Sequence, residues 1–130
     1  MNSIKDIFKR YYTKSLEKDV SKTVYDLFKW KKVDVFLKDH KTNKVLVDMK
    51  DLEFPEHYSQ NACDIIASKY FRKAGIPGKP GYESSMKSVA NRLVNFWCQA
   101  LKEEKLITTE KDAQIFYDEC VYALLSHMII

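Results

Sequence analysis

Histidine, cysteine and carboxylate side chains could do chemistry in this chain, but the three histidines are too scattered to share a metal ion. His40, His57 and His127 show no His-x-x-x-His or Glu-x-x-His spacing, which would place two ligands on one face of a helix. We therefore predict no metal site.

The three cysteines are odd in number and form no Cys-x-x-Cys pair. Cys63, Cys98 and Cys120 each lie on or beside the apolar stripe of an expected helix, with no obvious neighbouring base to activate a thiolate. We interpret them as reduced, buried thiols of a cytoplasmic protein.

Four carboxylates stand out in the last third of the chain, and we interpret them as solvated helix faces. They are Glu103, Glu104, Asp118 and Glu119. Nothing around them supports a hydrolase pair or a nucleophile triad. The sequence thus predicts neither catalytic nor cofactor-binding residues here.

Composition limits the protein to one ordinary domain of 130 residues, too short for a barrel enzyme with a large active site. Hydrophobic residues make up 45% and charged residues 31%, which is typical of a soluble globular domain. No apolar run approaches the ~20 residues of a membrane span, and residues 1–12 lack the apolar centre of a signal peptide. We expect a cytoplasmic protein with no membrane partner.

The net charge of +4 is unevenly distributed. Residues 1–50 carry 13 Lys or Arg against 7 acids, whereas residues 51–130 carry 9 against 11. The lysines are spread singly, so we favour a solvated face; nucleic acid, nucleotide phosphates or an acidic partner are the alternative.

The N-terminal half predicts a short helix followed by a β-hairpin. Apolar spacing in residues 3–13 predicts the helix, within an N-terminal helical extension of residues 1–21. Alternating side chains predict the hairpin near residues 24–49, with a bulge or strand start at Lys31-Lys32. Residues 51–57 are expected to form a loop.

The most informative stretch, residues 58–73, predicts an amphipathic helix with Ser59 as its N-cap. Its expected core positions are Ala62, Cys63, Ile66, Ala67 and Tyr70, widened by Ile65 and Phe71. Residues 75–81 hold all three glycines and two of the three prolines, so they predict a connector.

Two long helices are expected in the last third, over residues 84–105 and from Thr109 onward, where Asp112 would complete a reciprocal cap with Thr109. The expected core positions are Met86, Val89, Ala90, Leu93, Trp97, Ala100 and Leu101, then Ala113, Phe116, Tyr117, Cys120, Leu124 and Met128. The predicted class is α+β, mainly helical, with about four helices and one hairpin.

The last five residues, Ser-His-Met-Ile-Ile, contain neither a glycine cap nor a polar tail. A free carboxylate at a helix C-terminus is unfavourable, and Ile129 and Ile130 would be exposed there. We expect a piece of a longer or split protein, or an end that docks onto a second polypeptide.

Five ordered stretches carry a resemblance to a known family. Residues 24–35 read Val-Tyr-Asp-Leu-Phe-Lys-Trp-Lys-Lys-Val-Asp-Val, residues 54–62 read Phe-Pro-Glu-His-Tyr-Ser-Gln-Asn-Ala, and residues 67–72 read Ala-Ser-Lys-Tyr-Phe-Arg. Glu-Ser-Ser-Met at residues 83–86 and Phe-Tyr-Asp-Glu at residues 116–119 continue the series. Over residues 22–128 the chain resembles the N-terminal domain of bacterial adenosylcobalamin-dependent (class II) ribonucleotide reductases.

The resemblance implies a parent enzyme that converts ribonucleotides to deoxyribonucleotides for DNA synthesis, with adenosylcobalamin as its cofactor. The radical and redox cysteines of that family lie outside this domain, and the three cysteines here match none of those motifs. The resemblance thus implies a noncatalytic domain over residues 22–130 that binds no cofactor by itself. It would be inactive alone and would pack against the catalytic barrel, in cis or in trans.

Polar residues around the helix expected at 58–73 are our candidates for interdomain or ligand-proximal contacts, although they could also simply cap and solvate it. They are Gln60, Asn61, Lys69, Tyr70 and Arg72. One alternative function is a small basic module that binds single-stranded nucleic acid or a protein through residues 1–50 and their aromatics. Another is a helical interaction protein that dimerises through its last helix.

Overall fold

The computed structural model describes residues 9–19, 21–72 and 82–126, which belong to two compact units. Unit 1 combines the segment up to Leu27 with the chain from Ala90 onward, and unit 2 comprises Phe28–Val89. Helix α2 (Met86–Glu103) crosses this boundary, so its first turn belongs to unit 2 and the rest to unit 1.

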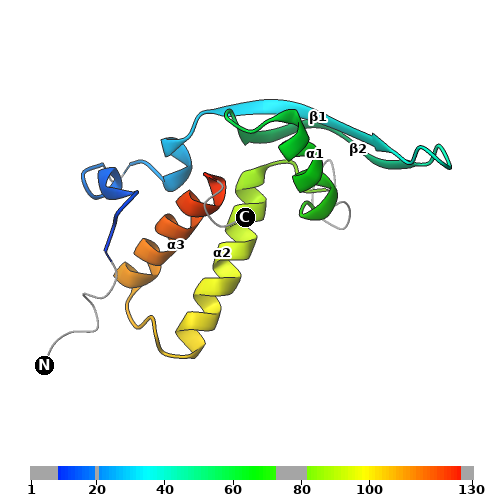
Figure 1. The fold of residues 1–130 in the computed structure, drawn as a ribbon. Coiled ribbons are helices and arrows are strands. Elements are labelled where there is room, and N and C mark those ends of the chain that lie inside the picture. Colours follow the sequence, from blue (N-terminus) through cyan, green and yellow to red (C-terminus); the bar gives the residue numbers. More distant parts are fainter. Residues whose placement is uncertain (1–8, 20, 73–81, 127–130) are drawn as a thin grey trace, which may run out of the picture. The chain divides into compact units, whose positions relative to one another are not determined.

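Unit 2 is built on an antiparallel hairpin of β1 (Trp30–Lys38) and β2 (Val45–Pro55), with α1 (Gln60–Lys69) packed against both strands (Figure 1). A hairpin alone is marginal in water, and α1 supplies the cover that its apolar face needs. The buried hairpin side chains are Val33, Val35, Val47, Met49, Leu52 and Phe54.

A bulge extends β2 beyond the predicted strand end. Val33 pairs with Leu52 and Val35 with Met49, so two steps along β1 match three along β2. Asp51 has φ 55°, and its N–H donates to Asp34 Oδ1 at 2.9 Å. The extra residue restores inward alternation after position 51, so the predicted loop at 51–57 was wrong up to Pro55. Of the two alternatives predicted for Lys31-Lys32, the strand start is close to the observed one, because β1 begins at Trp30, whereas the register shifts lie after Val33.

Helix α1 begins where the sequence predicts, because Ser59 Oγ accepts the Ala62 N–H at 3.1 Å. Cys63, Ile66 and Ala67 face the core and are at most 3% exposed. Phe71, just after the helix, stacks on Phe54 with ring centroids 5.3 Å apart. Two predicted core positions were wrong: Ile65 and Tyr70 are each 46% exposed.

The approach to α2 is tied to β2 and to the end of α1. Ser85 Oγ accepts the Lys87 N–H and donates to the Glu53 carboxylate at 2.6 Å. Arg72 and Glu83 are joined by two hydrogen bonds of 2.8 Å, one between their backbones and one from the Arg72 N–H to the Glu83 carboxylate. These bonds hold together the two ends of the predicted connector, which itself lies outside the described residues.

Unit 1 contains the rest of α2, the helix α3 (Glu110–Leu125) and two short 3-10 helices, Lys14–Glu17 and Val24–Leu27. Helix α2 ends in a Schellman-type turn, where Lys105 has φ 60° and the Leu106 N–H donates to the Leu101 carbonyl at 2.9 Å. Thr109 caps α3 by accepting the Asp112 N–H at 3.1 Å.

The buried face of α2 matches the predicted seam at Met86, Val89 and Ala90 and differs from it in the later turns. Val94 and Cys98 are buried, whereas Leu93 and Trp97 are half-buried and Ala100 is exposed. On α3, Ala113 and Leu124 are buried as predicted. The predicted positions Phe116, Tyr117 and Cys120 are only half-buried, and Met128 lies outside the described residues.

The described part of the N-terminal segment contradicts two predicted elements. Residues 9–13 are not helical, and residues 3–8 of the predicted helix lie outside the described ranges. Val24–Leu27 forms a 3-10 helix where a strand was predicted. In the part of the chain that the structure describes, three α-helices and one hairpin nevertheless confirm the α+β class. Within residues 9–19, 21–72 and 82–126, no helix is both long and apolar enough to cross a bilayer.

Loss of the α1 cap should destabilise the protein measurably. Because the Ser59→Ala substitution removes the acceptor for the Ala62 N–H, we expect it to lower the free energy of unfolding by about 1 kcal/mol, whereas Ser59→Asp retains it. Urea titration followed by circular dichroism measures the difference. Ser88→Ala, an exposed position on α2, is the matched control, and equal effects at both positions would contradict the capping role.

Candidate functional site

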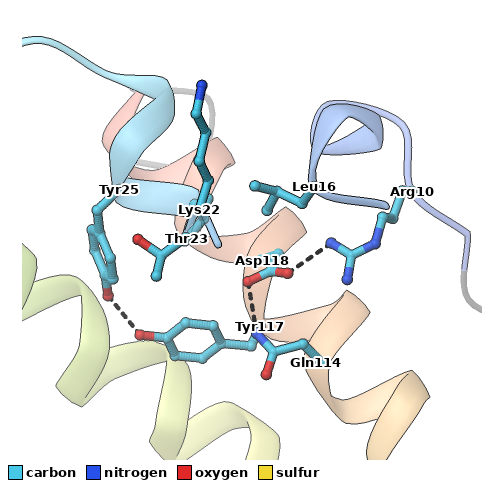
Figure 2. Close-up of a pocket in the computed structure, with 9 residues that line it drawn as sticks. Arg10, Leu16, Lys22, Thr23, Tyr25, Gln114, Tyr117 and Asp118 are labelled. Atoms are coloured by element: carbon cyan, nitrogen blue, oxygen red, sulfur yellow. Dashed lines mark hydrogen bonds and ion pairs between the residues drawn. The ribbon is translucent and has the colours of Figure 1, made fainter. Parts of the chain in front are cut away.

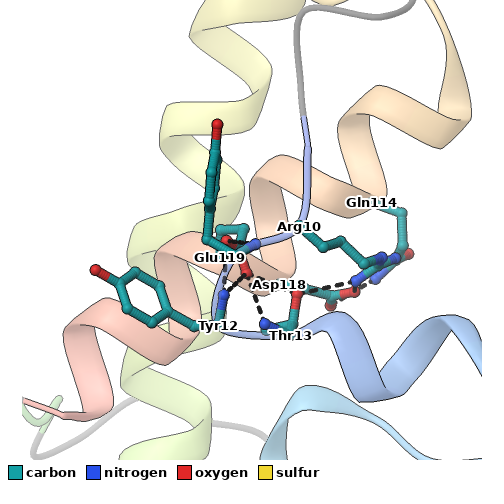
Figure 3. A network of polar contacts seen from close by, with 7 residues as sticks. Arg10, Tyr12, Thr13, Gln114, Asp118 and Glu119 are labelled. Atoms are coloured by element: carbon teal, nitrogen blue, oxygen red, sulfur yellow. Dashed lines mark hydrogen bonds and ion pairs between the residues drawn. The ribbon is translucent and has the colours of Figure 1, made fainter.

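The N-terminal segment is held on α3 by the carboxylate of Glu119 (Figure 3). That carboxylate accepts three successive backbone N–H groups, from Tyr11 at 2.6 Å, Tyr12 at 3.1 Å and Thr13 at 3.0 Å. The Thr13 hydroxyl donates a fourth bond of 2.7 Å. Consecutive N–H groups around one anion form a nest, so Glu119 fixes the path of the backbone at these residues.

A buried ion pair lies next to this nest. Arg10 Nη1 is 2.7 Å from Asp118 Oδ2, and their side chains are 12% and 6% exposed. Arg10 also donates to the Thr13 hydroxyl at 3.1 Å, and Gln114 Nε2 donates to Asp118 Oδ1 at 2.8 Å. Both oxygens of Asp118 are therefore engaged, which offsets the cost of burying its charge. The prediction that Asp118 is solvated was wrong.

A cavity of about 440 Å³ lies between this segment and α3 within unit 1 (Figure 2). Its volume lies within the range of small-molecule pockets. Lys22 extends away from Asp118 at its edge. The lining residues are Arg10, Leu16, Lys22, Thr23, Val24, Tyr25, Gln114, Tyr117 and Asp118.

Two tyrosine hydroxyls form a directed hydrogen-bond chain on the cavity wall. The Tyr117 hydroxyl donates its proton to Asn91 Oδ1 at 2.6 Å. Tyr25 is therefore the donor in the 2.6 Å hydrogen bond between the two hydroxyls. Burial and the hydrogen bond to Tyr117 raise the pKa of Tyr25, and burial raises the pKa of Tyr117. Both phenols stay protonated at neutral pH and act as hydrogen-bonding groups.

Tyr117 and Gln114 also line a second cavity of about 270 Å³ between α2 and α3. Asn95 Nδ2 donates to Asn91 Oδ1 at 3.1 Å on its α2 side. The amide and hydroxyl groups of the lining suit structural hydrogen bonding between two helices, and the charged residues Lys102 and Glu110 also line the cavity.

The cysteines are poorly suited to nucleophilic chemistry. All three are free thiols, and burial is the main cause that raises the pKa of Cys63, of Cys98 and of Cys120, the last to about 11. A thiol with a raised pKa carries little thiolate at neutral pH. The described residues contain no group of three or more His, Cys, Asp or Glu side chains that could hold a metal ion.

The five residues predicted as contacts lie at two ends of α1 and do not form one site. Gln60 is the first helical residue, and its Nε2 donates to the Asp34 carbonyl and to Asp64 Oδ1, while the neighbouring Asn61 is exposed. The other three, Lys69, Tyr70 and Arg72, are exposed at the far end, about 15 Å away for a ten-residue helix. Gln60 thus links the first turn of the helix to β1, Asn61 is exposed beside it, and Lys69, Tyr70 and Arg72 are exposed at the other end.

Similarity to known proteins shows the family of this chain. A family model described as class II vitamin B12-dependent ribonucleotide reductase, and specific to its N-terminal region, matches residues 32–127. The chain belongs to this family. Vitamin B12-dependent ribonucleotide reductases of Streptomyces coelicolor and Streptomyces clavuligerus are 38% and 37% identical to it over 101 residues, which is 78% of this chain and 10% of each relative. That of Bradyrhizobium diazoefficiens is 31% identical over 116 residues, covering 65% of this chain and 9% of the relative.

This reductase domain spans about a tenth of the length of the relatives it matches. The cavity residues Arg10 to Tyr25 lie before the matched region, whereas Gln114, Tyr117 and Asp118 lie inside it. Adenosylcobalamin, a corrin macrocycle carrying nucleoside groups, exceeds a cavity of about 440 Å³, and no histidine lines that cavity. The cavity residues therefore do not fit the cofactor.

Sequence reasoning missed Asp118, although its position carries a signal. Asp118 lies three residues after Ile115 and three before Val121, both buried, so a carboxylate occupies a core position of α3. A charge at such a position needs a partner, and a basic residue elsewhere in the chain could have been sought. Nothing in the sequence singles out Arg10 among 22 basic residues.

The buried ion pair should show strong coupling. We expect Arg10→Ala and Asp118→Ala each to lower the free energy of unfolding by about 3 kcal/mol, because each substitution leaves the charge of the other residue buried without a counter-ion. The double variant should cost clearly less than the sum of the two. A double-mutant cycle by urea unfolding measures the coupling, and additive losses would contradict it.

The exposed pair Lys102–Glu110 provides the matched control for that cycle. Its atoms are 4.0 Å apart and its side chains are 41% and 96% exposed. We expect no measurable coupling there, since solvent screens exposed pairs.

Cys120 should remain unreactive until high pH. Because the folded pKa is raised to about 11, above the unfolded value near 9, the protonated thiol favours the folded state. This contribution to stability is complete below pH 9 and is lost as pH rises through 11. We expect iodoacetamide to label Cys120 at least about tenfold more slowly in folded than in urea-unfolded protein at pH 8, as measured by mass spectrometry. Equal rates would contradict the raised pKa.

Proposed function

We propose that this chain is the noncatalytic N-terminal domain of an adenosylcobalamin-dependent ribonucleotide reductase, and that it packs against the catalytic barrel of that enzyme. The observation that carries the proposal is the match of residues 32–127 to the N-terminal family of class II reductases. The parent enzyme converts ribonucleotides to deoxyribonucleotides in the cytoplasm, and the cofactor and the substrate bind mainly outside this chain.

The chemistry of the described residues supports a structural role. The carboxylates of Asp118 and Glu119 are occupied by contacts within unit 1, and the cysteine thiols are held protonated by burial. These groups hold the fold together instead of presenting a nucleophile or an acid–base pair.

Exposed apolar side chains in both units support the packing. In unit 2 they are Phe36, Val45, Leu46, Ile65 and Tyr70, and in unit 1 they are Tyr11, Tyr12, Phe96 and Leu106. Where such side chains are contiguous, they are typical of contacts with another protein part. Asn61, Lys69, Tyr70 and Arg72 are exposed at the two ends of α1 and remain our candidates for such contacts, with Gln60 beside Asn61.

Reconstitution tests the proposal. We expect the purified chain alone to reduce no ribonucleotide. Mixed with the remaining reductase polypeptide and adenosylcobalamin, it should bind and raise the rate of deoxyribonucleotide formation at least about tenfold over that polypeptide alone. Calorimetry measures the binding and chromatography the product. An unrelated domain of similar size and charge is the control. Absence of both binding and rate change would overturn the proposal.

A further inference from the structure

Helix α2 has a second apolar side that unit 1 leaves uncovered. Leu93, Phe96, Trp97 and Ala100 recur at three- and four-residue spacing and so share one face of the helix, here called the α2 stripe. Phe96 is 72% exposed, Ala100 is exposed, and Leu93 and Trp97 are half-buried. The residues packed into unit 1, Val94 and Cys98, lie on another side of the same turns.

The α2 stripe is more than scattered surface hydrophobicity. Single exposed apolar residues are ordinary, but three large side chains on consecutive turns form a continuous ridge. Exposed Asn95 and Gln99 flank it as a polar border. An aromatic centre with a polar rim is typical of a protein–protein contact.

The Schellman-type turn extends the apolar surface beyond the end of α2. In such turns the residue after the left-handed position packs back toward the last helical turn. Here that residue is Leu106, and it is 56% exposed. The apolar surface therefore runs from Leu93 along α2 to its C-terminal end.

We infer that the α2 stripe docks onto the catalytic part of the reductase, an inference that rests on the proposed function. The stripe lies inside the matched region, residues 32–127, and the matched relatives carry about nine tenths of their length outside the aligned part. The N-terminal segment that covers α3 lies before residue 32 and covers a different surface.

The size of the α2 stripe favours the catalytic part of the reductase over a second copy of this chain as the partner. A strip about 10 Å long and about 10 Å wide is far smaller than the roughly 800 Å² per partner that a stable dimer needs. A larger partner that contacts further surfaces of the domain can use a strip of this size as its apolar centre. The occupant is an amphipathic helix or apolar groove, because the i, i+3, i+4 ridge fits between such side chains.

A charge placed on the stripe tests the inference. We expect Phe96→Glu to weaken binding to the remaining reductase polypeptide at least about tenfold, since burying an unpaired carboxylate in an apolar contact is unfavourable. Gln99→Glu, which makes the same charge change at an exposed position one turn away, should alter the dissociation constant less than about threefold. Calorimetry measures the affinities, and thermal unfolding verifies that both variants stay folded, as expected for exposed positions.

The outcomes separate the two proposals. If the unsubstituted chain binds and Phe96→Glu binds equally well, the α2 stripe is not the docking surface and the proposed function stands. If the unsubstituted chain does not bind, both fail. If sedimentation instead shows the isolated chain dimerising in a manner abolished by Phe96→Glu, the stripe is a self-interface and the inferred occupant is wrong.

Discussion

The buried charge of Asp118 is the constraint on which unit 1 depends. A buried carboxylate is costly unless a cation and further donors surround it, and for Asp118 on α3 these roles are filled by Arg10 and Gln114. Glu119, one residue on, accepts the next three backbone N–H groups of the same segment. The two adjacent carboxylates therefore determine where a stretch more than a hundred residues away runs. A buried ion pair adds little net stability, and here its main effect is to specify that path.

The fold was predictable where one local signal decided each element. Ser59 marks the start of α1, and alternating valines mark the hairpin, so both were found from the sequence. The errors fall where a tertiary contact overrides the local pattern. The spacing from Met49 to Leu52 breaks the alternation and suggests a strand end, but the bond between Asp34 and Asp51 turns that break into a bulge. The candidate site could not be predicted because its partners are distant in sequence.

Helix α2 shows a second limit of sequence patterns. Its apolar spacing predicts a single seam, yet Val94 and Cys98 pack into unit 1 while Phe96 and Ala100 are exposed. A hydrophobic stripe records that a face is buried somewhere, and it does not tell whether the cover comes from the same unit or from another polypeptide. The structure distinguishes these two cases, because it shows which side of α2 is buried within the chain and which side is exposed.

In this domain the chemically reactive side chains and the exposed apolar side chains are different residues. The carboxylate of Asp118 is buried and paired with Arg10, and burial raises the pKa values of the cysteine thiols. Several large apolar side chains are instead exposed, Phe96 in unit 1 and Phe36 in unit 2 among them. An active site would require the reverse, with perturbed groups open to a substrate and apolar groups enclosing it. Such an arrangement agrees with the packing role proposed for this chain.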